Sequence, residues 1–328
     1  MDSAVGLGQV EEQDPRRKKR RERRAERNAS GVWYPKWFWP AFAAPAAIWM
    51  ILLFLVSLYV VISLAFGTSD LIFRNPLPVY EPWWWSATPF KVALGRLFGV
   101  GGVSAFWFPV FVRTFVFVGV ASLICLVIGY AVAYYVARYG GRRKVMYLVL
   151  LISPFWISYL MRIFAWQNLL QPDGYINKFL AWLPFAQPVN WLEGKPVTVI
   201  LGLVYGYIPY MILPLYAQLD RINQSLLEAG RDLGASPRET FVRVTLPLSR
   251  QAILAGLIIV SLPMFGDYYT NNLLGGARTT MFGNLIDDAV GQSGQGPLAG
   301  SLVLILMVLL IIPMMYYLRS TNRAASQA

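Results

Sequence analysis

Histidine is absent from this sequence, and cysteine occurs once, at Cys125. Without histidine, the chain cannot carry an imidazole general base, a Ser-His-Asp or Cys-His nucleophile system, or a histidine-ligated zinc or haem site. A single cysteine excludes an intrachain disulfide and a thiolate metal cluster. Charged residues are also scarce, at 14% of the chain, against about 25% in soluble globular proteins. These shortages together argue against a soluble enzyme.

The residues that are abundant are those of a membrane protein. Hydrophobic residues make up 56% of the 328 residues, and the mean hydropathy is +0.48. The chain contains 12 tryptophans and carries a net charge of +12. Long apolar runs, a basic balance and frequent aromatic residues are typical of an integral membrane protein.

Apolar runs without Asp, Glu, Lys or Arg mark the segments that could cross a bilayer, since a spanning helix needs about 20 such residues. They predict six transmembrane helices, at Ala41–Phe66, Thr114–Ala137, Val145–Met161, Pro196–Leu219, Gln251–Gly266 and Pro297–Leu318. The third and fifth runs are short, and we expect them to extend into Arg162–Trp166 and Asp267–Thr270. A further uncharged run, Leu97–Val112, is interpreted as an interfacial approach to the second helix.

The distribution of basic residues predicts which side each loop faces. With six spans both termini lie on one side, and that side holds 21 of the 29 lysines and arginines. The positive-inside rule therefore places both termini in the cytoplasm. Residues 1–36 are expected to form a basic, disordered tail that can touch anionic lipid rather than nucleic acid. Residues 37–320 are expected to form the transmembrane domain, and residues 321–328 a short cytoplasmic tail.

Catalytic and cofactor motifs are missing. There is no G-x-x-x-x-G-K-[ST] loop, no G-x-G-x-x-G after a strand and no G-x-S-x-G elbow, so we expect no ATP hydrolysis by this chain and no bound cofactor or metal. The predicted spans also lack the acidic residues and histidines of a proton relay, and only Asp267 comes near that description. Arg162, at the outer end of the third span, is expected to reach toward lipid headgroups.

The longest internal cytoplasmic segment, residues 220–250, carries the clearest local signals. Ser225-Leu-Leu-Glu228 is a capping-box pattern, which predicts a short helix that starts near Ser225 and stops at Gly234. Ser236-Pro-Arg-Glu239 is a second capping box with proline at the first helical position. Pro247 is expected to break or kink this second helix. The segment is therefore predicted to form a helix-turn-helix outside the membrane.

Two glycines in this segment, Gly230 and Gly234, are four residues apart, which predicts a shared helix face that another backbone can approach. The segment resembles the EAA loop of ABC importer permeases. The resemblance rests on Glu228-Ala229-Gly230, then Gly234, then Val244-Thr245-Leu246-Pro247, at the spacing of that family. Gly230 stands for the family's third-position alanine and Val244 for its isoleucine. The resemblance covers roughly residues 40–320.

This resemblance implies a type I ABC importer permease fold, all-α, with six transmembrane helices and a cytoplasmic coupling helix. In such permeases the loop inserts into a groove on a separate ATPase subunit, which hydrolyses the ATP. The coupling residues that it implies are Glu228, Ala229, Gly230, Gly234, Leu246 and Pro247. The implied assembly, in a bacterial plasma (inner) membrane, adds a second and different permease subunit, two ATPase subunits and an external solute-binding protein.

Two further segments, 205–216 and 265–276, are similar to spermidine/putrescine permeases, which implies a polyamine as the cargo. A flexible polycation suits a path with aromatic faces and a sparse carboxylate. The candidate residues of this path are Asp267, Tyr268, Tyr269, Tyr205, Tyr207 and Tyr210. Alternatively, Asp267 lies hydrated at the interface beside anchoring tyrosines, and the tyrosines of the fourth span pack in the core.

Other functions remain open from the sequence. A permease of this kind could import an amino acid derivative, a sugar or ferric ion instead. A stand-alone secondary transporter, a membrane enzyme or a structural membrane protein would have a similar composition. The sequence shows neither an internal inverted repeat nor an ionisable residue deep in a predicted span, which argues against secondary transport.

Overall fold

The computed structural model describes residues 37–70, 76–102, 104–183, 187–291 and 294–325. The expected basic tail, residues 1–36, lies outside them. The chain divides into two compact parts, residues 1–58 and 59–328, and each is described by itself. In the first part, the structure describes one helix, α2 (Phe38–Ala65), whose last turns belong to the second part.

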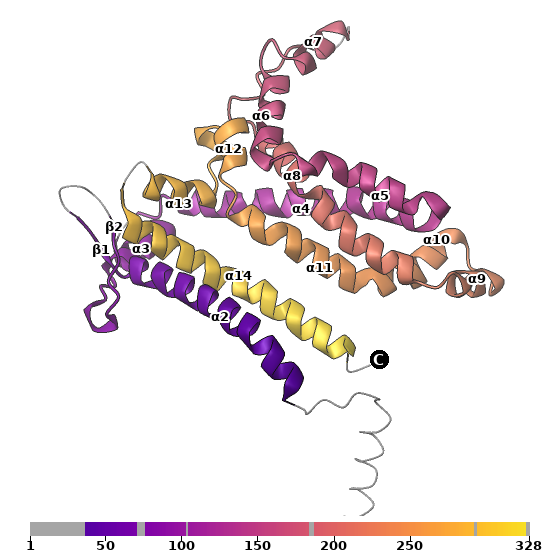
Figure 1. The fold of residues 1–328 in the computed structure, drawn as a ribbon. Coiled ribbons are helices and arrows are strands. Elements are labelled where there is room, and N and C mark those ends of the chain that lie inside the picture. The colour runs from indigo at the N-terminus through magenta and orange to yellow at the C-terminus, as the bar shows by residue number, and fades with distance from the viewer. Residues whose placement is uncertain (1–36, 71–75, 103, 184–186, 292–293, 326–328) are drawn as a thin grey trace, which may run out of the picture. The chain divides into compact units, whose positions relative to one another are not determined.

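The second part is built almost entirely from helices (Figure 1). They are α3 (Thr88–Phe98), α4 (Phe108–Tyr139), α5 (Lys144–Ile152), α6 (Tyr159–Leu170), α7 (Tyr175–Trp182), α8 (Pro196–Arg221), α9 (Gln224–Asp232), α10 (Pro237–Thr240), α11 (Leu246–Phe265), α12 (Tyr269–Leu274), α13 (Phe282–Val290) and α14 (Gly296–Ala325). Two short antiparallel strands, β1 (Thr68–Ser69) and β2 (Pro76–Leu77), follow α2. A π-helical segment, Phe241–Thr245, joins α10 to α11.

Five helical segments are long and apolar enough to cross a membrane: α2, α4, α8, the continuous stretch Pro237–Phe265, and Gly296–Thr321. A bent pair of helical segments passes the same test together and makes a sixth if it is one span. The predicted all-α fold with six transmembrane helices is thereby confirmed, with the third span in an unexpected form. Leu97–Val112 contains the end of α3 and the start of α4 and adds no span among the described residues, as predicted.

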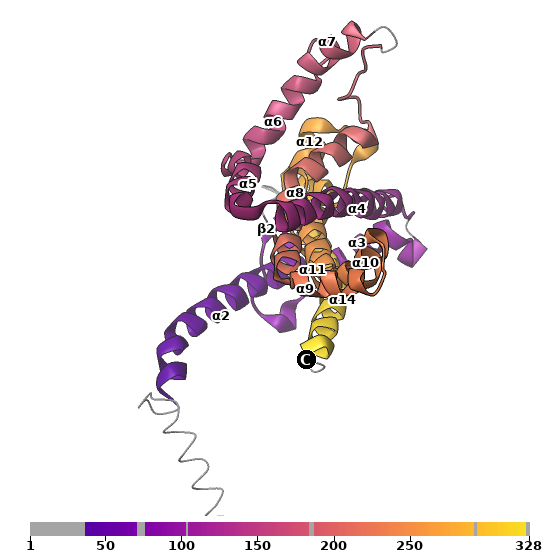
Figure 2. The ribbon, with the colours of Figure 1, turned by 90° about the vertical axis from the view of Figure 1, so that its right-hand side faces the viewer.

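The third span is broken by a sharp bend. The segments Gly141–Trp156 and Tyr159–Trp182 meet at 83°, and Figure 2 shows α6 and α7 leading away from α5. Ile157 and Ser158 both have extended ψ values of 140°, which ends the helical path between them. The helical path does continue through Arg162–Trp166, as expected, but these residues belong to α6 beyond the bend.

The fifth span does not continue past Phe265, and the helix that contains it starts before the predicted run. Its helix begins at Pro237 and ends at Phe265, so Asp267–Thr270 do not continue it. Gly266 closes the helix, and its backbone N–H bonds the carbonyl of Pro263 in the last turn. The chain then turns through Asp267 and Tyr268 into α12.

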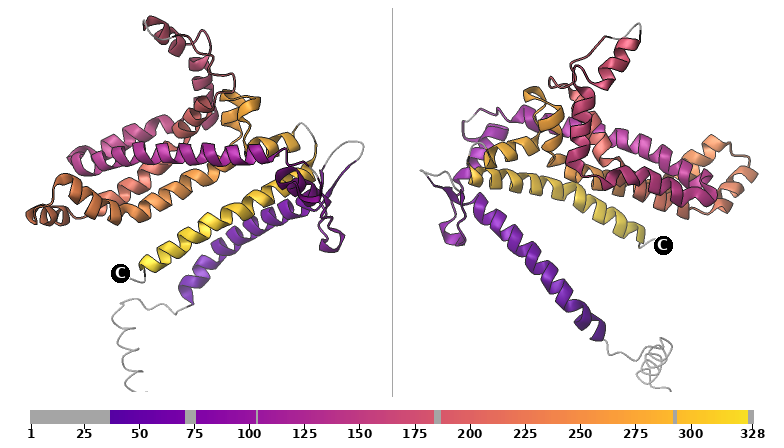
Figure 3. Two further views of the ribbon diagram at one scale, coloured as in Figure 1. Left: turned by 180° about the vertical axis from the view of Figure 1, so that it is seen from behind. Right: turned by 45° about the horizontal axis from the view of Figure 1, so that its top comes forward.

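The core lies where α4, α8 and α11 pack against one another (Figure 3). Small residues allow these helices to approach: a Cβ atom added to Gly129 of α4 would lie 2.9 Å from Met211 Cγ of α8. Gly256 of α11 meets the same methionine, since its added Cβ would lie 2.6 Å from the sulfur. Cys125 is fully buried in this core, as expected for a small packing residue.

We predict that Gly129→Leu destabilises the protein by about 1–3 kcal/mol, the usual cost of overfilling a packed core. The matched control is Gly119→Leu on the same helix, where an added Cβ meets nothing within 4 Å. Thermal unfolding of the detergent-solubilised protein would measure both. Equal midpoints for the two variants would contradict this description of the α4–α8 contact.

Candidate functional site

The segment between α8 and α11 forms a helical hairpin, residues 223–247, which we call the coupling hairpin. Its first helix, α9, is capped by Asn223, whose side-chain oxygen accepts a hydrogen bond from the Ser225 backbone N–H at 3.2 Å. The predicted cap at Ser225 is therefore wrong by two residues, although the predicted helix is present. Asn and Ser are comparable caps, so the sequence alone offered two adjacent starts.

The end of α9 depends on one glycine. Gly234 has a φ of +84°, and its N–H bonds the Arg231 carbonyl at 2.8 Å. The N–H of Ala235 bonds the Gly230 carbonyl at 3.1 Å, which completes a Schellman motif. Gly234 thus lies beyond the helix and does not share a face with Gly230, so that prediction is wrong. A Cβ added to Gly230 would make ordinary contact with Thr240, 3.7 Å away, so the family's alanine would fit here.

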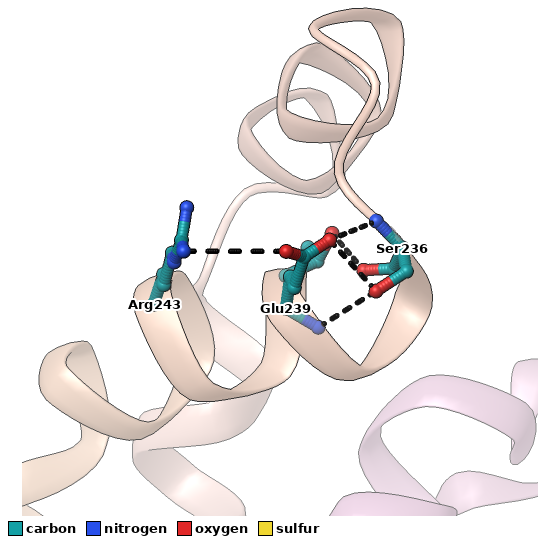
Figure 4. A network of polar contacts seen from close by, with 4 residues as sticks. Ser236, Glu239 and Arg243 are labelled. Carbon is teal, nitrogen blue, oxygen red and sulfur yellow. Dashed lines mark hydrogen bonds and ion pairs between the residues drawn. The ribbon is translucent and has the colours of Figure 1, made fainter.

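The second helix of the hairpin begins at the predicted capping box (Figure 4). The backbone N–H of Ser236 donates to Glu239 Oε2 at 2.9 Å, and the Glu239 N–H donates to Ser236 Oγ at 3.3 Å. Arg243 lies 4.0 Å from the other carboxylate oxygen of Glu239. These hydrogen bonds from Ser236, backbone first and hydroxyl second, hold the pKa of the exposed Glu239 carboxyl below its ordinary value.

Pro247 does not break this helix, so the first of the two outcomes expected for it is wrong. It is the second residue of α11, the helix that directly follows the π-helical segment Phe241–Thr245. The Leu246 N–H bonds the Phe241 carbonyl, five residues back. Since proline lacks an N–H and crowds the preceding turn, the wider π turn lets the helix continue past it.

The exposed surface of the coupling hairpin mixes apolar and charged groups. Leu233 is 89% exposed, and Leu226 is also exposed, while Leu227 packs inward. Glu228 and Ala229 are exposed on α9, whereas Leu246 and Pro247 are exposed at the start of α11. The six predicted coupling residues therefore form two groups, one at the tip of the hairpin and one at its base.

A second polar centre surrounds Asp267, which is only 6% exposed. Its Oδ2 atom accepts hydrogen bonds from the Tyr159 hydroxyl at 2.6 Å and from the Tyr207 hydroxyl at 3.3 Å. Thr270 adds two more: its hydroxyl donates to Oδ2 at 2.7 Å and its backbone N–H to Oδ1 at 3.0 Å. These residues come from α6, α8 and the start of α12. The alternative of a hydrated Asp267 at the interface does not agree with this burial.

Arg162 lies beside this centre and is 8% exposed. Its guanidinium carbon is 4.4 Å from the ring centre of Phe155, 5.6 Å from that of Tyr159 and 5.8 Å from that of Tyr205. Its Nε donates to the Ile157 carbonyl at 3.2 Å. The prediction that Arg162 reaches toward headgroups is wrong, because the bend before α6 turns its side chain onto these aromatic faces.

The other path candidates lie around these two groups. Among the six, Asp267 and Tyr207 are joined by a hydrogen bond. Tyr205 contacts Arg162, and Tyr210 is exposed, with its ring centre 6.3 Å from that of Tyr207. Tyr268 and Tyr269 stack on each other at 4.1 Å. In the described residues, no cluster of three acidic or cysteine side chains could hold a metal ion.

Sequence reasoning missed two residues of this centre, Tyr159 and Thr270. Thr270 could have been found, because it follows Asp267 by three residues and side chains at that spacing meet easily. Tyr159 had no local signal, since it lies 108 residues before Asp267.

The glycines of Leu273-Leu274-Gly275-Gly276 have a structural role. A Cβ added to Gly276 would lie 3.2 Å from the Gly194 backbone, and one added to Gly275 would lie 2.2 Å from Asn271 Oδ1. They allow the chain after α12 to pack closely against the last turn of that helix and against the backbone at Gly194.

We predict that acidification loosens the start of the second hairpin helix. The lowered pKa of Glu239 means that its stabilising contribution is full above the ordinary glutamate pKa and is lost as the pH falls through the lowered one. In Glu239→Gln the amide oxygen accepts the same hydrogen bonds at every pH. Hydrogen exchange of the Ser236 and Glu239 amides should therefore accelerate relative to this variant between about pH 6 and about pH 3. If the ratio of the exchange rates in the wild type and in Glu239→Gln stayed constant over this pH range, the ionised Glu239 carboxylate would not be what stabilises the helix start.

Comparison with known proteins places the chain in a family. The family model described as "Binding-protein-dependent transport system inner membrane component" matches residues 37–323. The chain is 36% identical over 203 residues to the spermidine/putrescine transport system permease protein PotB of Escherichia coli (strain K12), covering 62% of this chain and 74% of that protein. It is 31% identical over 218 residues to the inner membrane ABC transporter permease protein YdcU of the same strain, covering 62% and 69%.

Solved structures show the same fold. The crystal structure of a bacterial ABC transporter involved in the import of the acidic polysaccharide alginate contains a chain that superposes with a TM-score of 0.65 at 16% identity, covering 93% of this chain and 99% of that one. A chain from the alginate transporter in complex with its alginate-pentasaccharide-bound periplasmic protein gives 0.61 at 17% identity, covering 88% and 98%. The chain therefore belongs to the family of inner membrane components of binding-protein-dependent transport systems and has the type I ABC importer permease fold.

Proposed function

We propose that this permease is one half of the membrane pathway of an ATP-driven importer of polyamines, spermidine or putrescine. The observation that carries the proposal is the buried carboxyl group of Asp267, which is held by hydroxyl groups alone among side chains. In the described part of the chain, no lysine or arginine nitrogen lies within ion-pair distance of it. The similarity to PotB supports the same cargo.

The chemistry of this centre suits an ammonium group. A primary ammonium can replace a tyrosine hydroxyl as the donor to Asp267, and the displaced rings can then cover the methylene chain and the charge. Tyr207 is the donor most easily replaced, because its hydrogen bond of 3.3 Å is the longest of the four. The aromatic ring of Tyr210 lies directly beyond it.

The proposed assembly follows from the coupling hairpin. An external solute-binding protein delivers the polyamine, and a second, different permease subunit completes the pathway. Two ATPase subunits receive the hairpin tips, which carry Glu228, Ala229, Gly230 and Gly234, while Leu246 and Pro247 anchor the base. With this hairpin in the cytoplasm, both termini lie there as well, as the excess of basic residues indicates.

Two alternatives use the same residues differently. A permease of this family could carry another small solute, such as an amino acid derivative, a sugar or ferric ion. A neutral sugar gives no reason for a carboxyl group without a basic partner, and the described residues hold no cluster of acidic or cysteine side chains for ferric ion. The ammonium group of an amino acid derivative would suit Asp267, and the similarity to PotB favours a polyamine over it. A stand-alone secondary transporter is opposed by the family membership itself.

We predict that Asp267→Asn lowers uptake of spermidine and putrescine by about tenfold, the equivalent of about 1.4 kcal/mol of lost attraction for the cation. The full complex in proteoliposomes, with labelled polyamine outside and ATP inside, would measure this. The control is Asp173→Asn, the same change at an exposed aspartate between α6 and α7. Equal uptake by both variants would remove Asp267 from the path, and absence of uptake by the wild type would reject the cargo.

We also predict that Leu233→Asp releases the ATPase subunits. The Leu233 side chain is 89% exposed, so the hairpin does not need it for its own packing, whereas a docked ATPase would bury it. Leu77→Asp is the control, because it makes the same change at an exposed leucine of β2, outside the hairpin. Co-purification of the ATPase with each variant reports the outcome. Retention of the ATPase by Leu233→Asp would show that this face does not dock.

A further inference from the structure

The longest described helix, α4, runs without interruption from Phe108 to Tyr139. Its 32 residues correspond to about 48 Å at 1.5 Å per residue. Of the five long spans that the structure describes, it is the one without an interior proline: α2, α8, α11 and α14 each contain at least one. Because proline removes a backbone hydrogen bond and kinks a helix, α4 is the stiffest of these elements along its axis.

At its inner end, α4 holds the first leg of the coupling hairpin. Arg138 Nη1 donates to the carbonyl of Ile222 at 3.1 Å. Ile222 is the C-cap residue of α8, directly before the cap of α9. Just beyond α4, Lys144 forms an ion pair with Asp220 of α8. Because Ile222 directly precedes the hairpin, a displacement of α9 would be passed to α4 through the hydrogen bond from Arg138.

The second leg of the hairpin also contacts α4. The ring of Phe241, the first residue of the π-helical segment, packs edge-on at 5.7 Å from Tyr130 and 5.6 Å from Tyr134. The Tyr130 hydroxyl is 2.9 Å from the Ser249 hydroxyl of α11. Both legs are therefore fixed to the same stretch of α4.

At its outer end, α4 holds the segment next to Asp267. Arg113 Nε donates to the Thr280 carbonyl at 2.8 Å, and its Nη1 donates to the Arg278 carbonyl at 2.6 Å. The neighbouring Thr114 hydroxyl accepts from the backbone N–H of Phe282 at 2.8 Å. These three hydrogen bonds attach the segment between α12 and α13 to α4.

That connection in turn supports the carboxyl centre. Asn284 of α13 donates to the carbonyl of Tyr268 at 3.1 Å and to the side chain of Asn272 at 2.7 Å. Tyr268 directly follows Asp267, and Thr270 of α12 supplies two of its hydrogen bonds. A shift of α4 along its axis would therefore move the backbone that holds Asp267.

We propose that Arg113 and Arg138 are positioning residues that make α4 the element linking the coupling hairpin to the Asp267 centre. This inference rests on the proposed function. The other two helices that lead from the hairpin are less stiff, since α8 contains Pro209 and Pro214, and α11 follows a π-helical segment and contains Pro263. Both arginines act through carbonyl groups, and Arg113 uses two donors of its planar fork at once, a geometry that lysine cannot reproduce.

The test compares Arg113→Met, Arg138→Met and the double variant in the complete complex, with Arg142→Met as the control at an exposed arginine just after α4. The quantity measured is the amount of solute imported per ATP hydrolysed. We expect each single variant to lower this ratio on the order of tenfold while ATP hydrolysis continues, and the control to keep it. If the two arginines act in series through α4, the double variant will import no less solute per ATP than the more impaired of the two single variants.

Three outcomes would each overturn the inference. The single variants could leave the amount of solute imported per ATP unchanged, or uptake and ATP hydrolysis could fall in parallel. In the double variant, the losses of the two single variants could multiply. If a methionine variant does not assemble, Arg113→Lys and Arg138→Lys keep the charge and the aliphatic stem, and the same ratio is measured. If a lysine variant also failed to assemble, the inference would be overturned, because the arginine would then be required for folding. The wild-type complex separates the two proposals: if it imports a solute other than a polyamine, the ratio is measured with that solute.

Discussion

The carboxyl group of Asp267 can be buried only because three hydroxyl groups and one backbone amide surround it. An unpartnered polar group inside an apolar medium costs several kcal/mol, so the elements that supply these donors must meet with little tolerance. Two glycines of α8 allow this meeting. A Cβ added to Gly206 would lie 2.5 Å from the Tyr159 ring, and one added to Gly202 would lie 2.7 Å from the Thr270 side chain. The approach of α6 and α12 to α8 is therefore set by the need to enclose one carboxyl group.

The existence of the spans could be predicted from the sequence because apolar length is a property of single segments. Their breaks could not. The run Val145–Met161 contains no charge, yet the chain turns by 83° after Trp156. The one local hint was Ser153-Pro154, and proline inside the other spans is tolerated without such a turn. What decides between a kink and a break is the packing of the following helix, which the sequence of the run does not contain.

The coupling hairpin was predictable in more detail, since its signals act over four or five residues. The capping box at Ser236 and Glu239 has the expected hydrogen bonds. The error at Ser225 arose because Asn223 and Ser225 could both cap the helix. The error at Gly234 arose because the four-residue spacing from Gly230 was interpreted as helical, although the helix ends before Gly234. The centre at Asp267 shows the opposite limit. Its shortest contact, with Tyr159, joins residues 108 positions apart, and no local rule pairs them.

The placement of Arg162 explains how a basic residue can lie near Asp267 without forming an ion pair with it. At 4 Å and an effective dielectric constant of 20, a guanidinium would attract an ionised carboxylate by about 4 kcal/mol, which corresponds to about a thousandfold weaker binding of a competing ammonium group. The rings of Phe155, Tyr159 and Tyr205 instead hold Arg162. Tyr159 serves both groups, with its ring toward the arginine and its hydroxyl toward Asp267. Loss of that ring would release the arginine as well as remove a donor, so the aromatic cage protects the availability of the carboxyl group for a cation.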